Sequence, residues 1–183
     1  MSNYSTNYDR AFNKLMLIET GGDLDGGYND IQGDAGGATK WGFAQNYNPD
    51  IDVRTLTRDQ AKERYHVKHW KQMNLDLVLD YDIAYEIFEN GINSNHWFAI
   101  QCIQGTLNMF GHKLVMDGQL GPATASAINM FKDKYAVLKM QNLLQGMMLI
   151  VGFENFNTVK EMIVKRYGYS GKFLRGWMKR IEL

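Results

Sequence analysis

Apolar residues recur every three or four positions through most of the chain, which is the spacing of amphipathic helices. In the first such segment the stripe contains Tyr8, Phe12 and Leu15, and Glu19 falls on it one turn later. The same pattern predicts helices within 55–70, 80–93 and 97–110, and two or three more after residue 124. Thr57 and Gln60 have the spacing of a capping box, which fixes the start of the second helix.

The segment from Gly21 to about Phe43 breaks this pattern, because it is rich in glycine and aspartate and favours turns with short hairpin strands. Gly21 and Gly22 come directly after the first helix, so we expect them to stop it with positive φ angles. The fold class predicted is therefore mostly α, with a small β-hairpin element in the N-terminal third.

Composition narrows the class of protein. The 183 residues are 45% hydrophobic, enough for one compact domain with a core, and 20 basic residues balance 20 acidic ones, so no nucleic-acid partner is indicated. The end of the chain from Lys160 is basic, which fits either a solvated helix face or contact with an anionic bacterial envelope. Cys102 is alone and is interpreted as a small buried apolar residue, and no segment has the pattern of a signal peptide or a membrane span.

Glu19 is the residue with the clearest potential for chemistry. A carboxyl group on an apolar stripe at the C-terminal end of a helix is expected to have a raised pKa, which suits a general acid that protonates a leaving oxygen. The aspartates of the following loop offer the second carboxylate that glycoside hydrolysis normally needs. From the residues alone, a solvated glutamate followed by ordinary Asp-Gly turns also explains this pattern, and such turns are the commonest use of Asp-Gly clusters.

Two possible metal sites are weaker interpretations of the sequence. The stretch 23–34 has aspartates but lacks the terminal glutamate of a calcium loop. His66 and His69 lie three residues apart on a predicted helix, but no second cluster of zinc ligands follows. We therefore expect neither a metal nor a cofactor.

Four ordered motifs resemble the phage muramidases of glycoside hydrolase family 108. The stretch "GDAGGATKWGFAQ" resembles that family's "DPGGATxxGI", and "IAYEIFENGINSN" is similar to its "lA…FDxaVNxG" helix. "DGQLGPAT" and "FLRGWMKRIEL" resemble its "DGxxGPxT" turn and its closing "FxxGWxxR" helix. The resemblance implies a lysozyme-like α-helical fold and cleavage of the β-1,4 bond between N-acetylmuramic acid and N-acetylglucosamine.

The resemblance also implies a set of site residues. The essential glutamate of the family falls on Glu19, although "EGGY" has become "ETGGDLDGGY", and a competing alignment would place Asp25 there. We prefer Glu19 because Asp25 does not lie at a helix end. The "DPGGAT" aspartate and threonine fall on Asp34 and Thr39. In related tailed-phage lysozymes, an aspartate and a threonine that follow the glutamate in this order hold a water. Substrate contacts are expected from three further residues, namely Tyr28, Gln45 and Asn93.

Two other function classes stay open beside a muramidase. A lytic transglycosylase needs only one acid, and "DGQLGPAT" also occurs in noncatalytic peptidoglycan-binding modules. We expect a catalytic lobe at 1–94 and a helical lobe at 95–183 that resembles a peptidoglycan-binding region, packed as one compact unit. The expected protein is a monomeric endolysin. It would be made in the host cytoplasm without a signal peptide and act on periplasmic peptidoglycan after holin-type release.

Overall fold

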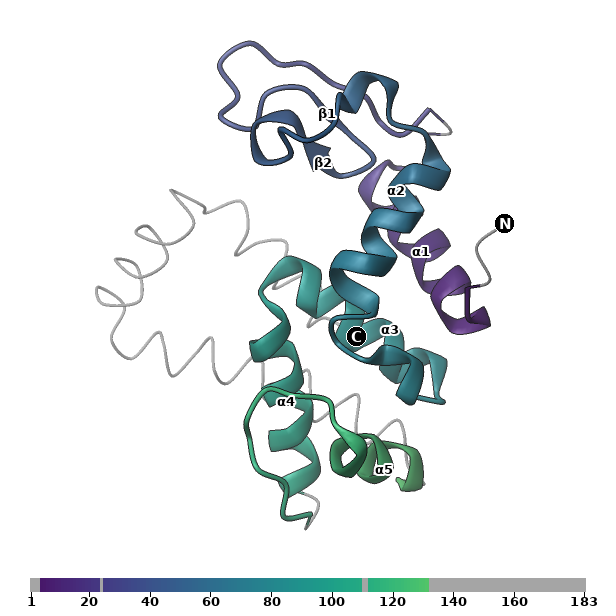
Figure 1. Cartoon of the computed structure of the whole chain (residues 1–183), viewed down its shortest axis with the longest axis vertical. Helices are drawn as coiled ribbons and strands as arrows, with labels where there is room; N and C mark the ends of the chain where they lie inside the picture. Colours follow the sequence, from purple (N-terminus) through teal and green to yellow (C-terminus); the bar gives the residue numbers. More distant parts are fainter. Residues whose placement is uncertain (1–3, 24, 110–111, 132–183) are drawn as a thin grey trace, which may run out of the picture.

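The computed structural model describes residues 4–23, 25–109 and 112–131, and this part of the chain is mostly helical with one small antiparallel sheet (Figure 1). In chain order the elements are α1 (Thr6–Glu19), β1 (Thr39–Lys40), β2 (Phe43–Ala44), η1 (Gln45–Tyr47), η2 (Val53–Thr55), α2 (Arg58–Tyr65), the π-helical turn η3 (His66–Trp70), η4 (Leu75–Leu77), α3 (Tyr81–Asn93), α4 (His96–Met109) and α5 (Pro122–Met130). The hairpin lies at one end of the long axis, and α4 and α5 lie at the other. The predicted fold class is confirmed.

Side-chain caps fix where the helices begin. The hydroxyl of Ser5 accepts a hydrogen bond from the Tyr8 amide at the start of α1, and Asp80 caps α3 in the same way. Thr57 and Gln60 form the predicted capping box at α2, with both reciprocal hydrogen bonds present. α1 ends at Glu19, and Gly21 and Gly22 follow with φ angles of 63° and 85°, which confirms the predicted helix stop.

The core is built from aromatic residues that α1, α2, η3 and α3 contribute. Tyr8 and Phe12 of α1 are fully buried, and the Tyr8 ring contacts those of Trp70 and Phe88. The Tyr65 ring, at the end of α2, lies 5.9 Å from that of Phe12 between ring centroids. Edge-to-face and tilted ring pairs of this kind add about 0.5–1.5 kcal/mol each beyond their buried area. The middle of α1 is thereby held close to the C-terminal end of α2.

A two-residue turn joins the strands of the hairpin. Thr39 pairs with Ala44 and Lys40 with Phe43, and the two turn residues, Trp41 and Gly42, have φ angles of 53° and 76°. Positive φ at both central positions is the signature of the type I′ turn, whose twist matches that of a two-stranded hairpin. Glycine adopts this conformation freely, but for tryptophan it costs about 1–2 kcal/mol. Tertiary contacts must therefore hold Trp41 in place.

The second half of the described chain packs on α3. α4 packs against α3, and α5 packs against α4. The buried Gln104 of α4 donates to the Asp117 carboxylate and accepts from the Gly118 amide, so it fixes the turn that precedes α5. Cys102 is buried as predicted, and burial raises the pKa of its thiol to about 12.

Residues 132–183 lie outside the described part of the chain, and with them the predicted basic C-terminal helix and the "FLRGWMKRIEL" motif. The boundary between lobes at 94 and 95 stays a prediction. Within the described ranges, no helix combines the length and the apolar character that crossing a membrane requires.

Candidate active site

Glu19 is the last residue of α1, and its side chain is exposed. The prediction that it lies on a buried stripe is therefore wrong. The stripe is buried through Tyr8, Phe12, Leu15 and Met16, but it ends one turn earlier. Helical spacing assigns a residue to a face, and it does not say whether a neighbour covers that face at the end of the helix. The consequence for function is favourable, since an exposed carboxyl group is accessible to a polymer.

The turn between β1 and β2 approaches Glu19 closely. The position that a Cβ atom on Gly42 would occupy lies 4.0 Å from Glu19 Oε2 and 2.4 Å from the hydroxyl oxygen of Tyr65. A side chain at this position would collide with Tyr65, so both the positive φ and the available space require glycine. Glu19, Gly42 and Tyr65 therefore converge from α1, the hairpin and α2.

Trp41 fixes this turn against the rest of the lobe. Its backbone amide donates to Gly26 O over 2.7 Å, and its indole Nε1 donates to Leu56 O over 3.1 Å. The hydroxyl of Tyr65 donates to Trp41 O over 3.2 Å. The indole also lies against the backbone of Gly26, where a Cβ atom would come within 2.4 Å of it. These contacts offset the strain of the positive φ angle at Trp41.

Tyr65 is a site residue that the sequence did not identify. Its side chain is only 4% exposed. Burial raises the pKa of the phenol, and the negative charge of Glu19 raises it further. The periodic position of Tyr65 marks it as a core residue, and no local motif distinguishes it from Phe12 or Phe88. Its link to Glu19 depends on the hairpin turn at Gly42, which lies close to both side chains.

Asp34 and Thr39 lie on the loop and strand that lead into the hairpin. Asp34 is exposed, and its Oδ1 accepts from the Gly36 amide over 2.8 Å, which is an Asx turn. The Thr39 hydroxyl donates to Gly37 O over 3.3 Å. A Cβ atom built on Gly36 would lie 3.5 Å from Asp34 Oδ1 and 3.1 Å from Ala44 Cβ. Asp34 therefore lies toward the Ala44 end of the hairpin, whereas Glu19 lies at the Gly42 end.

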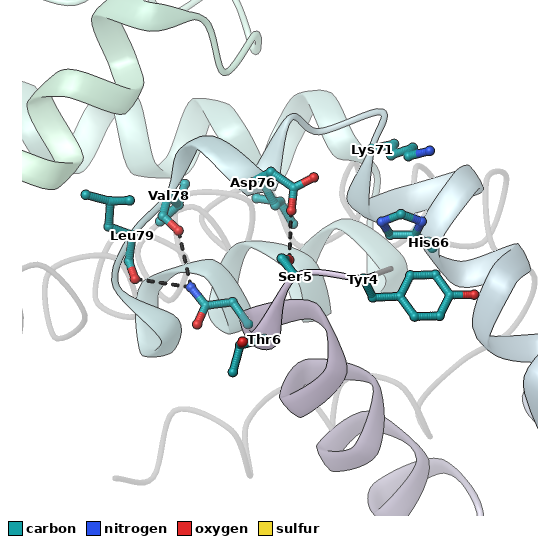
Figure 2. Close-up of a pocket in the computed structure, with 10 residues that line it drawn as sticks. Tyr4, Ser5, Thr6, His66, Lys71, Asp76, Val78 and Leu79 are labelled. Atoms are coloured by element: carbon teal, nitrogen blue, oxygen red, sulfur yellow. Dashed lines mark hydrogen bonds between the residues drawn. The ribbon is translucent and has the colours of Figure 1, made fainter. Parts of the chain in front are cut away.

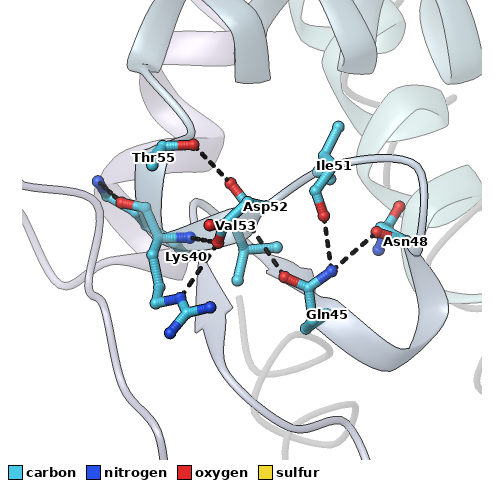
Figure 3. Close-up of polar contacts among 8 residues, drawn as sticks. Lys40, Gln45, Asn48, Ile51, Asp52, Val53 and Thr55 are labelled. Atoms are coloured by element: carbon cyan, nitrogen blue, oxygen red, sulfur yellow. Dashed lines mark hydrogen bonds and ion pairs between the residues drawn. The ribbon is translucent and has the colours of Figure 1, made fainter.

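The three residues expected to contact substrate differ in their surroundings. Tyr28 is 43% exposed in the loop before β1. Asn93, at the end of α3, donates from its side chain to Glu89 O over 2.9 Å. Gln45 donates to the backbone oxygens of Asn48 and Ile51 and accepts from the Val53 amide, so its side chain holds the loop together (Figure 3). A direct substrate contact by Gln45 would compete with these bonds.

His69 and His96 form a pair near Tyr65. His69 Nδ1 lies 3.0 Å from His96 Nε2, and the His69 ring centroid lies 5.7 Å from that of Tyr65. Burial lowers the pKa of His69 to about 4, with His96 and Lys68 contributing, and burial also lowers the pKa of His96. His66 instead packs against the rings of Tyr4 and Tyr8. Among the described residues, no group of three or more His, Cys, Asp or Glu side chains is placed to bind a metal.

A hollow of about 640 Å³ lies at the other end of α1 (Figure 2). Ser5 donates to Asp76 on its wall, and the side chain of Asn7 donates to the backbone oxygens of Val78 and Leu79. The 14 residues of α1 separate this hollow from Glu19, a length of roughly 20 Å. It is therefore distinct from the site around Gly42.

Comparison with protein families finds a match over part of the chain. Residues 22–94 match the family described as Glycosyl hydrolase 108. Within this segment the chain is similar to that family. The match covers the hairpin, α2 and α3 and contains Asp34, Thr39 and Tyr65, and it begins three residues after Glu19.

The fold agrees with a solved structure. The chain is similar to the solved structure of Brucella abortus SagA, with a TM-score of 0.62 and 18% sequence identity. The match covers 96% of this chain and 89% of that chain. At this identity the likeness supports the fold alone. No curated protein matches the chain.

Proposed function

We propose that this chain belongs to glycosyl hydrolase family 108 and is an N-acetylmuramidase that hydrolyses the β-1,4 bond between N-acetylmuramic acid and N-acetylglucosamine, with Glu19 as the general acid. The observation that carries the proposal is the placement of the Glu19 carboxyl group, exposed at the end of α1 and next to the Gly42 turn. An exposed carboxyl group beside Gly42, which has no side chain to block access, can reach the glycosidic oxygen of a bulky polymer. Glu19 would give its proton to that oxygen as the bond to the anomeric carbon breaks.

Asp34 and Thr39 are proposed to hold the attacking water. Thr39 uses its own proton for Gly37 O, so its oxygen can accept from a water. Asp34 accepts from Gly36 through Oδ1, which leaves Oδ2 as a further acceptor. A water that donates one hydrogen to each directs a lone pair at the anomeric carbon. As it attacks, one of its protons passes to Asp34, and the sugar gains a hydroxyl group.

The substrate implied by the family is peptidoglycan. We further propose that the chain acts as a monomeric phage endolysin on the periplasmic wall, after release across the inner membrane by a holin-type partner. A lytic transglycosylase is the nearest alternative, because it needs an acid but no held water. The hydrogen-bonding state of Asp34 and Thr39 favours the hydrolase.

Mass spectrometry of the products from purified peptidoglycan tests the proposal. A muramidase releases fragments with reducing N-acetylmuramic acid ends. Fragments with 1,6-anhydro ends would instead establish a transglycosylase, and reducing N-acetylglucosamine ends a glucosaminidase. An intact polymer in the presence of bound protein would indicate a noncatalytic wall-binding protein.

A further inference from the structure

Tyr47 is an exposed aromatic residue close to the loop that carries Asp34. It is the last residue of η1, which directly follows the hairpin, and it is 72% exposed. A single exposed aromatic residue is common on protein surfaces and needs no explanation by itself. What distinguishes Tyr47 is its position relative to the proposed water site.

The Tyr47 ring and the Asp34 carboxylate both lie next to Gly36. A Cβ atom built on Gly36 would lie 3.7 Å from Tyr47 Cε2 and 3.5 Å from Asp34 Oδ1. Gly36 itself is buried, whereas Tyr47 and Asp34 are both exposed. The edge of the ring and the carboxylate are therefore within 4 Å of one point, and a single hexose ring with its substituents can contact both.

Hydrogen bonds of the preceding residue fix this arrangement. The Asn46 amide donates to Gly36 O over 3.0 Å, and the Asn46 side chain donates to Ala35 O over 2.9 Å. The backbone that carries Tyr47 is thus joined to the loop that carries Asp34. Because the backbone is already in place, only the side chain of Tyr47 would lose freedom when a ligand binds, which keeps the entropic cost of binding low.

Asn48 and Gln45 fasten the other side of η1. The Asn48 side chain donates to Ala44 O over 2.9 Å, and the Gln45 side chain donates to Asn48 O over 3.2 Å (Figure 3). Gln45 therefore supports this turn, and Tyr47, two residues later, is the large side chain that the turn presents to solvent.

We propose that Tyr47 is a substrate-binding residue whose ring stacks on a hexosamine ring of the glycan strand. An aromatic ring can cover the C–H-bearing face of a sugar while the sugar hydroxyl groups stay available to water and to polar side chains. The water held by Asp34 attacks the anomeric carbon, so Tyr47 contacts the glycone, which is the part of the strand that keeps this carbon. This inference rests on the proposed muramidase function.

The test compares kcat and KM on the soluble tetrasaccharide of two N-acetylglucosaminyl-N-acetylmuramic acid units. Tyr47→Ala should raise KM roughly tenfold with kcat nearly unchanged, because stacking stabilises the bound substrate and the transition state equally. Tyr47→Phe keeps the ring and should keep the wild-type KM. Leu79→Ala is the matched control, since Leu79 is 75% exposed beside the hollow at the other end of α1, and its KM should equal that of the wild type.

An unchanged KM in Tyr47→Ala would overturn the proposal, and so would a fall in kcat at constant KM. If Tyr47→Ala melts well below the wild type, Tyr47→Leu retains an apolar side chain beside Gly36 but has no flat ring. It should still raise KM, and a wild-type KM in that variant would refute stacking.

Failure of the proposed function has a different signature. A wild type that binds the tetrasaccharide in calorimetry without cleaving it would refute the muramidase. The dissociation constant of Tyr47→Ala would then decide the role of Tyr47 by itself, with a roughly tenfold increase supporting stacking and an unchanged value excluding it.

Discussion

The hydroxyl group of Tyr65 lies so close to the backbone of Gly42 that a methyl group cannot fit between them. The Cβ atom of an alanine at 42 would come within 2.4 Å of this oxygen, and the φ angle of 76° is itself unfavourable for alanine. Because Glu19 Oε2 lies 4.0 Å from the same Cβ position, a change at Gly42 should disturb the proposed acid as well as the fold.

Gly42→Ala should therefore lower both stability and activity. Gly33→Ala is the matched control, since Gly33 has a φ angle of 87° but nothing within 4 Å of its Cβ position. We expect the control to lose about 1 kcal/mol from backbone strain alone. Gly42→Ala should lose a further 1–3 kcal/mol or so from the collision, with a large drop in peptidoglycan hydrolysis. Urea unfolding measures the difference, and equal losses in the two variants would contradict the close approach.

Glu19→Gln should remove hydrolysis while the protein stays folded. The amide keeps the shape of the side chain, but it has no proton to give to the leaving oxygen. The loss should be ~10²- to 10⁴-fold, the usual contribution of a general acid. Glu63→Gln is a suitable control, because Glu63 contacts Tyr4 near the other end of α1. A residual rate above roughly a tenth of wild type would argue against Glu19 as the acid.

The different outcomes for α2 and for Glu19 show how far sequence reasoning reaches. The start of α2 was predictable because a capping box is a local device between Thr57 and Gln60. The type I′ turn was not, because Trp-Gly lacks the Asn-Gly or Asp-Gly signature, and contacts from Gly26, Leu56 and Tyr65 hold Trp41. The exposure of Glu19 likewise depends on tertiary packing. Spacing along a helix predicts neighbours within the helix and not those that cover its end.

Gln45→Leu separates support of the loop from contact with substrate. The substitution removes three hydrogen bonds, to Asn48 O, Ile51 O and the Val53 amide, and leaves backbone groups without partners. We expect a loss of about 1–3 kcal/mol in unfolding free energy, and a loss of activity that follows the melting curve. Gln32→Leu, at an exposed position in the same lobe, should change little. If Gln45→Leu raised KM without lowering the melting temperature, a direct substrate contact would be indicated.

The His69–His96 pair should make stability depend on pH. The pKa of His69 is about 4 in the folded protein and about 6.5 when unfolded, so the unfolded chain binds protons first as the pH falls. The contribution is complete above about pH 6.5 and is lost as the pH falls toward 4. His69→Gln cannot be protonated at this position. Between pH 6.5 and 4.5 its unfolding free energy should therefore fall by roughly 1–2 kcal/mol less than that of the wild type. Urea titrations at both pH values measure this, and parallel losses would show that His69 is not responsible.

Asp34→Asn tests how the water is held. The amide oxygen can still accept from the Gly36 amide, so the Asx turn should persist, whereas the negative charge that receives the water's proton is gone. We expect a loss of about 10- to 100-fold, smaller than that of Glu19→Gln, because Thr39 would still orient the water. Asp34→Ala, which also loses the turn, should be less stable. A rate for Asp34→Asn equal to that of wild type would exclude Asp34 as the base.

The anomer released at the first cleavage then distinguishes the two possible roles of Asp34. If Asp34 and Thr39 hold a water opposite Glu19, attack occurs from the far side of the sugar and the product is the α-anomer. A carboxylate acting as nucleophile would have to lie about 5–5.5 Å from the acid, whereas a water between them needs about 6.5–9.5 Å. The placement of Glu19 at the Gly42 end of the hairpin and of Asp34 toward the Ala44 end favours the larger separation. NMR recorded before mutarotation should therefore detect the α-anomer, and a β-anomer would assign Asp34 as the nucleophile.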